Sequence, residues 1–258
     1  MGFELSPMWE IYDSLIDSVP AAATVAEVVS AQYWVAVKSS LGGTGVAHIL
    51  PHPDQTPLPD PSSLIGRSLK DVARTVKSWD ETETATGLAA ITASANSALL
   101  AAGLTADSPQ SGQAAFDKFL ELARDKKVAV VGHFPNLEPV EKVAREFFIL
   151  ERQPQAGDLP DTAAEYLLPD MEVVFITGSA LVNKSLPRLL ELAGPAFIGL
   201  VGPSVPLCPS LFDYSVNCLS GTVFNDYPKI ARAVLEGRTT SLFKYGGFRV
   251  NLEPGFCF

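Results

Sequence analysis

The sequence is poor in several residue types that mark common classes of protein. Its 258 residues include three cysteines and three histidines, and 19 Lys and Arg stand against 29 Asp and Glu, for a net charge of −10. Cys208, Cys218 and Cys257 are odd in number and form no CxxC pair. A disulfide framework is therefore not expected. We expect the protein to be cytoplasmic, where thiols stay reduced. The shortage of basic residues excludes nucleic acid as an expected partner, because phosphate contacts need a clustered basic surface.

Long apolar runs are also missing. The one long uncharged stretch, Thr84 to Ala106, is interrupted by Thr, Ser and Asn, so it predicts a buried helix and not a membrane span. The first residues, Met1 to Ser6, lack the basic start and apolar core of a signal peptide. We therefore expect no membrane association.

The first part of the chain reads as a helix, then strands, then helices, which is the order of an α+β unit. Its pattern predicts helices over 8–18, 68–77 and 84–102, strands over 24–29, 32–38 and 45–50, and a proline-rich loop over 51–61. The polar segment Asp107–Gly112 contains both Pro and Gly and is typical of a linker. We place the domain boundary there, with residues 1–108 in one domain and 109–258 in the next.

Beyond the linker, strands and helices alternate. The runs 128–131, 147–150, 173–177, 196–201 and 216–219 are apolar without alternation, as in strands of a parallel sheet that is buried on both faces. Helices are predicted over 114–124, 139–146, 162–168, 186–192 and 228–235. This alternation of strands and helices indicates a doubly wound, Rossmann-like α/β domain. Two short runs around Gly246-Gly247 predict a closing hairpin.

The predicted ligand site lies beyond the carboxyl ends of these strands, where open parallel sheets bind ligands. Of the ends of the first four of these strands, three contain glycine, which lets backbone approach a ligand closely. The expected ligand-binding residues there are Gly132, Phe134, Glu151, Thr177, Gly178, Ser179, Asn183, Gly202, Pro203 and Ser204. Asn183 has a second interpretation, as a residue that caps the next helix.

His133 and Asp158 are the candidate catalytic residues. A histidine at a strand end suits a general acid/base or a metal ligand, with a turn histidine as the structural alternative. Asp158 follows the second strand and could reach the same crevice. Glu151 lies 19 residues after Gly132, near the spacing of an acid that holds a ribose. However, the turn reads Gly-His-Phe-Pro and not GxGxxG, so it lacks the glycines that let a pyrophosphate approach the backbone. NAD is therefore disfavoured, and an adenosyl ligand without a pyrophosphate remains a candidate.

Two further motifs bear on a metal or ligand site. His48 and His52 are four residues apart, but Pro51 and Pro53 exclude the helix that would align them, so a metal would rely on a single open site at His133. The turn Gly42, Gly43, Thr44 and Gly45 lacks the Lys-Ser/Thr of a P-loop. It predicts either a hairpin turn or a backbone cradle for a ligand.

Taken together, these motifs resemble the prokaryotic domain family of unknown function labelled putative heavy-metal chelation. The resemblance spans nearly the whole chain and rests on the segments Gly42–Gly45, Gly87–Ala90, Val130–Pro135, Gly157–Pro160, Ile176–Asn183 and Gly202–Pro206. It implies an enolase N-terminal-like α+β domain followed by a Rossmann-like domain similar to methyltransferases. It also implies an interdomain pocket lined by Gly132, His133, Asp158, Thr177, Gly178, Asn183, Gly202 and Ser204, with Gly42–Gly45 from the first domain.

Three hypotheses follow. In the first, the protein binds, and condenses or hydrolyses, a small metal chelator that is pterin-, flavin- or siderophore-like, with a transition metal or a metal chelate as the bound species. The second is a methyltransferase-like enzyme that binds S-adenosylmethionine or a nucleoside. The third is a binding module without catalysis. A homodimer is a reasonable expectation for such a protein.

Overall fold

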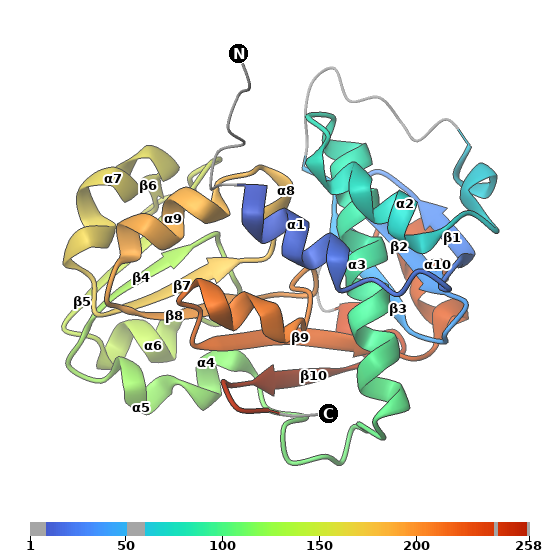
Figure 1. Ribbon diagram of the computed structural model, residues 1–258. Helices are drawn as coiled ribbons and strands as arrows, with labels where there is room; N and C mark the ends of the chain where they lie inside the picture. The colour runs from blue at the N-terminus through green and yellow to red at the C-terminus, as the bar shows by residue number, and fades with distance from the viewer. Residues whose placement is uncertain (1–8, 51–59, 240–241, 257–258) are drawn as a thin grey trace.

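The protein is described by a computed structural model over residues 9–50, 60–239 and 242–256 (Figure 1). Ten strands form one sheet in the order β1-β2-β3-β9-β8-β7-β4-β5-β6, with β10 also paired to β9. The amino-terminal residues, most of the predicted loop over 51–61, His52 and Cys257 lie outside the described residues. The predicted α/β class with a large, mostly parallel sheet is confirmed.

The second half of the chain is the doubly wound unit. Its parallel strands are β4 (Lys127–Val131), β5 (Glu146–Glu151), β6 (Leu159–Pro160), β7 (Val173–Thr177), β8 (Phe197–Val201) and β9 (Cys218–Phe224). Counted within this unit, the spatial order is 3-2-1-4-5-6, which is the Rossmann arrangement. The strand order changes direction between β4 and β7, so the turns after these two strands frame a ligand crevice.

Both faces of this sheet are buried, which explains its apolar strands. Val128 and Val130 pack in one cluster with Phe175, while Ala129 and Val131 pack in another on the opposite face. Helices α4 (Ala115–Lys118), α5 (Leu120–Ala123) and α6 (Glu138–Val143) cover the first face; α7 (Ala164–Leu167), α8 (Ser179–Val182) and α9 (Leu186–Ala193) cover the second (Figure 1).

The first half adds an antiparallel meander to the same sheet. The meander consists of β1 (Val25–Ser30), β2 (Trp34–Ser39) and β3 (Thr44–His48). The helices of this half are α1 (Glu10–Asp17), α2 (Leu69–Ala73) and α3 (Glu81–Ala101). Along β2, Val35 and Val37 pack with Leu88 of α3. The alternate residue Trp34 packs with Ile230 of α10 (Tyr227–Leu235) on the opposite face.

Helix α3 is buried along most of its length, as the sequence predicted. Three of its hydroxyls, those of Thr86, Thr92 and Ser97, donate to carbonyls four residues earlier in the helix, as Thr92 Oγ1 does to Leu88 over 2.9 Å. The buried Asn96 side chain instead leaves the helix: its Nδ2 donates to the carbonyls of Thr44 in β3 (2.7 Å) and Thr222 in β9 (3.2 Å). Asn96 therefore bridges the two halves of the sheet, while the division at residue 108 stays a prediction.

Two predicted elements were wrong. The first run of the expected closing hairpin is a 3₁₀ turn, Leu242–Lys244, and the second is β10 (Gly247–Leu252), which pairs antiparallel with β9. The sequence pattern could not show this, because β9 continues to Phe224 and offers β10 a complete edge. The helix expected over 114–124 is broken at Phe119 into α4 and α5.

Two glycines of the 42–45 turn, Gly43 and Gly45, serve close packing. The hairpin turn itself is present, with the Gly42 N–H donating to the Ser39 carbonyl over 3.0 Å. A Cβ on Gly43 would lie 2.3 Å from the Ser97 nitrogen, and one on Gly45 would lie 2.2 Å from the Ala89 carbonyl oxygen. The turn and β3 thus lie directly on the backbone of α3, which explains two of the glycines by packing, while a ligand cradle at this turn stays a prediction.

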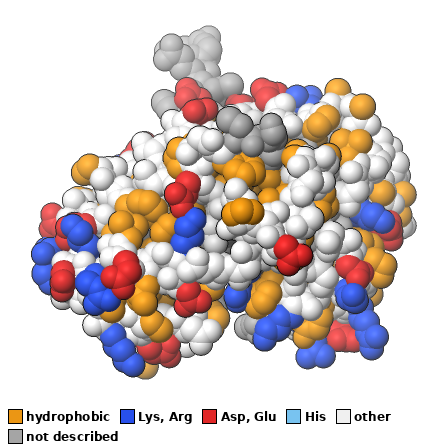
Figure 2. All heavy atoms as spheres, turned by 90° about the horizontal axis from the view of Figure 1, so that it is seen from below, with side chains coloured by type: hydrophobic (Ala, Val, Ile, Leu, Met, Phe, Trp, Pro, Cys, Tyr) orange, Lys and Arg blue, Asp and Glu red, His pale blue; other side chains and the backbone are white. Residues whose placement is uncertain are grey.

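The surface carries charges of both signs. On the face shown in Figure 2, basic and acidic side chains are interspersed around the rim. Many are paired, as Lys126 and Arg145 are with Glu172. Within the described residues, no helix is both long enough and apolar enough to cross a membrane.

We predict that Gly45→Ala lowers the free energy of unfolding by about 3 kcal/mol or more, because its methyl group would enter the backbone of α3. Gly42→Ala is the matched control: its φ of +106° is strained for alanine, but nothing lies within 4 Å of the added Cβ, so the loss is about 1 kcal/mol. Urea unfolding measures both. Equal, small losses would contradict the packing role of Gly45.

Candidate functional site

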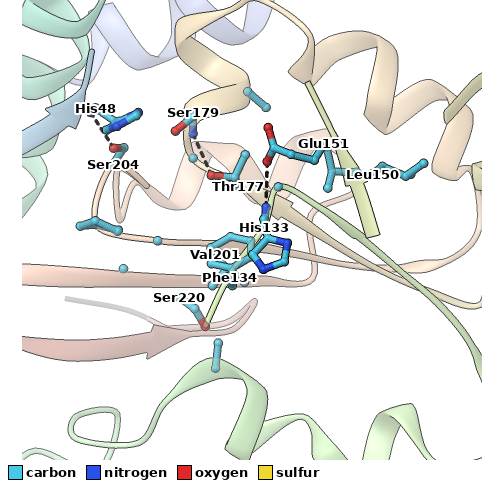
Figure 3. Close-up of a pocket in the computed structure, with 18 of the residues that line it drawn as sticks. His48, His133, Phe134, Leu150, Glu151, Thr177, Ser179, Val201, Ser204 and Ser220 are labelled. Carbon is cyan, nitrogen blue, oxygen red and sulfur yellow. Dashed lines mark hydrogen bonds between the residues drawn. The ribbon is translucent and has the colours of Figure 1, made fainter. Parts of the chain in front are cut away.

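A cavity of about 1060 Å³ lies over the carboxyl ends of β4, β5, β7 and β8. The first half of the chain contributes Trp34, His48 and Leu50 to its wall, and β9 and β10 contribute further residues. The cavity therefore lies between the two halves of the chain, at the crevice that the strand order frames. Figure 3 shows the side chains that point into it.

The structure brings most of the sequence-predicted site residues together. The cavity is lined by His133 and by all the strand-end candidates, namely Gly132, Phe134, Glu151, Thr177, Gly178, Ser179, Asn183, Gly202, Pro203 and Ser204. Asp158 contacts the site through His133. The exceptions are Gly42, Gly43, Thr44 and Gly45, which do not line this cavity.

The turn after β4 is shaped by a glycine and a carboxylate. Gly132 has φ +102°, and a Cβ there would lie 3.0 Å from the Thr177 side chain. One oxygen of Glu151 accepts the His133 backbone N–H over 2.9 Å (Figure 3), and the other accepts the Gln153 N–H over 3.2 Å. Glu151 thus fixes the backbone from which the His133 side chain projects.

His133 forms an ordered pair with Asp158. Its Nδ1 lies 2.9 Å from Asp158 Oδ2, and the exposed fractions of the two side chains are 34% and 2%. The Gln155 N–H donates to the same Asp158 oxygen over 3.0 Å, which holds the carboxylate in place. Because an ionised carboxylate accepts the Nδ1 proton, the neutral imidazole has its lone pair on Nε2. Such a nitrogen can accept a proton or bind a metal.

The ends of β7 and β8 are held by close backbone packing. A Cβ on Gly178 would lie 2.8 Å from the backbone of Ser204, so these two turns require a glycine here. The Ser204 hydroxyl accepts the His48 N–H over 3.0 Å. Asn183 accepts the N–H and the hydroxyl of Ser185 through Oδ1, and so orders the turn before α9.

Sequence reasoning missed His48 as a site residue. It ends β3 and lies edge-on to Trp34, with ring centroids 4.9 Å apart. Burial lowers the pKa of His48, against an opposing effect of the Glu151 charge. The signal was its place at the end of a strand, but only the pairing of β3 with β9 brings that end to the cavity. Four polar residues of β9 and β10 were also missed, Ser220, Thr222, Arg249 and Asn251.

The protein's own donors do not suit a bare transition metal. No three His, Cys, Asp or Glu residues gather to hold an ion anywhere in the part of the chain that the structure describes. His133 offers one nitrogen, and Cys208 and Cys218 are both buried. A metal in this cavity would need other ligands.

The family profiles described as Putative heavy-metal chelation match residues 12–95, for the DUF4213 domain, and 114–253, for DUF364. The chain belongs to the DUF364 family. A crystal structure of a DUF364 protein of unknown function from Desulfitobacterium hafniense has a TM-score of 0.86 and 35% identity, covering 96% of this chain and 100% of that one.

Two further proteins are similar to this chain at lower identity. A second DUF364 structure of unknown function, from Pyrococcus horikoshii, has a TM-score of 0.76 at 20% identity and covers 95% of this chain and 99% of that one. An uncharacterised protein of Methanocaldococcus jannaschii is 28% identical over 196 residues, 73% of each chain. The first of these supports the fold alone.

We predict that acid destabilises the protein partly through His48. Because burial lowers the pKa of His48 in the folded state, the unfolded chain binds this proton more readily below its ordinary pKa of about 6.5. Stability is therefore lost as the pH falls below about 6.5, by up to about 1.4 kcal/mol per pH unit.

Urea unfolding of the wild type and His48→Gln between about pH 7.5 and 5 measures this loss. The difference between the two proteins cancels the contributions of shared carboxylates. It should fall with decreasing pH, and a difference that does not change with pH would contradict the prediction.

Proposed function

We propose that this protein binds a small metal-chelating molecule in the cavity between its two halves, with its metal facing His133. The observation that carries the proposal is the His133–Asp158 pair, in which a buried carboxylate orients an imidazole toward a cavity of about 1060 Å³. Histidines that bind metals are almost always oriented through their other ring nitrogen, by a carboxylate, a backbone carbonyl or a water. The description of the family supports the same chemistry.

A chelate fits the cavity better than a bare ion does. The chelator supplies the donors that the protein lacks, and His133 Nε2 adds one more. The wall includes Trp34, Phe134, Leu150 and Val201, which suits the flat, partly apolar rings of pterin-, flavin- or catecholate-type chelators. The ligand is thus recognised by its ring and its metal.

The same pair also suits acid/base work on the bound molecule. His133 Nε2 could take a proton from an attacking water or hydroxyl and return it to a leaving group, while Asp158 stabilises the imidazolium. This chemistry would let the protein condense or hydrolyse a chelator. We place the reaction in the cytoplasm.

The test is titration of the full chain with Fe³⁺–catecholate and Cu²⁺–pterin-6-carboxylate complexes, followed by visible absorption. We expect the wild type to bind at least one complex, His133→Ala to weaken binding at least about tenfold and Asp158→Asn about tenfold, because the imidazole loses its orientation. Cys208→Ser is the control for adventitious thiol binding and should match the wild type. Equal binding by all four proteins, or none by the wild type, would refute the proposal.

A second candidate is an adenosyl ligand, which the position of Glu151 favours. Glu151 ends β5, next to the Gly132 turn, where doubly wound folds place the acid that holds a ribose. Calorimetry with S-adenosylmethionine and S-adenosylhomocysteine would then show binding that Glu151→Gln weakens about tenfold, the cost of a lost charge-assisted hydrogen bond. No heat and no thermal shift with either ligand would exclude this candidate.

A further inference from the structure

One wall of the cavity is a polar face on the ladder between β9 and β10. Ser220 pairs with Asn251 in this ladder, and Thr222 pairs with Arg249. All four residues line the cavity, since paired and alternate residues of two neighbouring strands share one face. Ser220, Thr222 and Asn251 are more than nine-tenths buried. The proposed contacts of the chelate, with His133 and with the apolar wall, do not involve this face.

Part of this face is fixed by internal hydrogen bonds. The Ser220 hydroxyl donates to Asn251 Oδ1, and Asn251 Nδ2 donates to the Gln113 carbonyl over 3.0 Å. The Thr222 hydroxyl, by contrast, has no hydrogen-bond partner within the described residues, although its backbone carbonyl accepts from Asn96. Thr222 therefore offers a free hydroxyl beside an ordered pair.

Arg249 brings a positive charge to the same face. Its guanidinium stacks on the Phe243 ring, 3.8 Å from the centroid, and no described carboxylate lies within 4 Å of it. The other arginines of the cavity wall are paired, Arg152 with Glu81 and Arg188 with Glu165. In a chain with ten excess acidic charges, an arginine that faces a cavity without a partner carboxylate is a ready partner for an anion.

We propose that the β9–β10 face is an anion subsite, at which the carboxylate or phosphate group of the ligand binds. The Arg249 fork donates two parallel N–H bonds to the anionic oxygens, the geometry in which arginine recognises carboxylate and phosphate. The Thr222 hydroxyl donates a third, and Phe243 holds the guanidinium plane. This subsite deepens the proposed function, on which it rests: the chelator carries an anionic group as well as its metal.

The experiment uses two simple anions, inorganic phosphate and citrate, titrated into the full chain at low ionic strength by calorimetry. The wild type should bind at least one of them, and the preferred anion tells phosphate from carboxylate. Arg249→Gln should weaken that binding at least about tenfold and Thr222→Val about threefold to tenfold. Arg238→Gln is the matched control, because Arg238 also lies over an aromatic ring, Tyr245, but does not line the cavity.

Binding that Arg249→Gln leaves unchanged, or no binding of either anion by the wild type, would overturn the subsite. If Arg249→Gln does not fold, Arg249→Lys and Thr222→Val carry the test, and both should bind more weakly than the wild type. The two proposals fail separately. Anion binding without any chelate binding would refute the proposed function alone, whereas chelate binding that Arg249→Gln does not alter, with no anion binding, would refute the subsite alone.

Discussion

The structure depends on how one buried amide joins the two halves of its sheet. Strands β3 and β9 share a single register pair, Thr44 with Phe224, which is little to hold an antiparallel meander against a Rossmann-like sheet. Asn96 spans this junction with hydrogen bonds to the Thr44 and Thr222 carbonyls. It can reach them because Gly43 and Gly45 let α3 lie directly on β3. The hydrogen bonds of Asn96 thus depend on Gly43 and Gly45, since a side chain at either glycine would move Asn96 away from both carbonyls.

This junction also builds the cavity. By fixing β3 beside β9, it places His48 above the carboxyl ends of the parallel strands, where its N–H donates to the Ser204 hydroxyl. The carbonyl of Thr222 is held by Asn96, while the Thr222 side chain faces the cavity. One wall therefore comes from the first half of the chain and the rest from the second, so a ligand between them would stabilise their arrangement.

The strand ends of the site could be predicted from the sequence, because a strand buried on both faces is continuously apolar. Val173–Thr177 was predicted to the residue, and the rule that ligands bind at carboxyl ends then gathered His133 and Glu151. The strand that pairs with β10 could not be predicted, because the alternating pattern of β10 suits the edge of any sheet. Arg249 is recognised as a site residue only once β10 is paired with β9, which places it opposite Thr222. The glycines at 42–45 were ambiguous for a different reason, since close approach of a helix and close approach of a ligand both require glycine.

Several polar groups of the cavity already have partners in the protein, and three groups without one indicate the chemistry of the ligand. Glu151 holds two backbone N–H groups, Asp158 holds His133, and Asn251 holds Gln113, so the wall is ordered before a ligand arrives. Within the described residues, the groups of the wall without a strong partner include His133 Nε2, the Thr222 hydroxyl and the Arg249 guanidinium, and the buried Trp34 Nε1 donor is a further one. A nitrogen lone pair binds a proton or a metal, and a guanidinium binds a negatively charged group. A chelate with an anionic group satisfies both demands at once, whereas a neutral molecule would leave the arginine without a counter-charge.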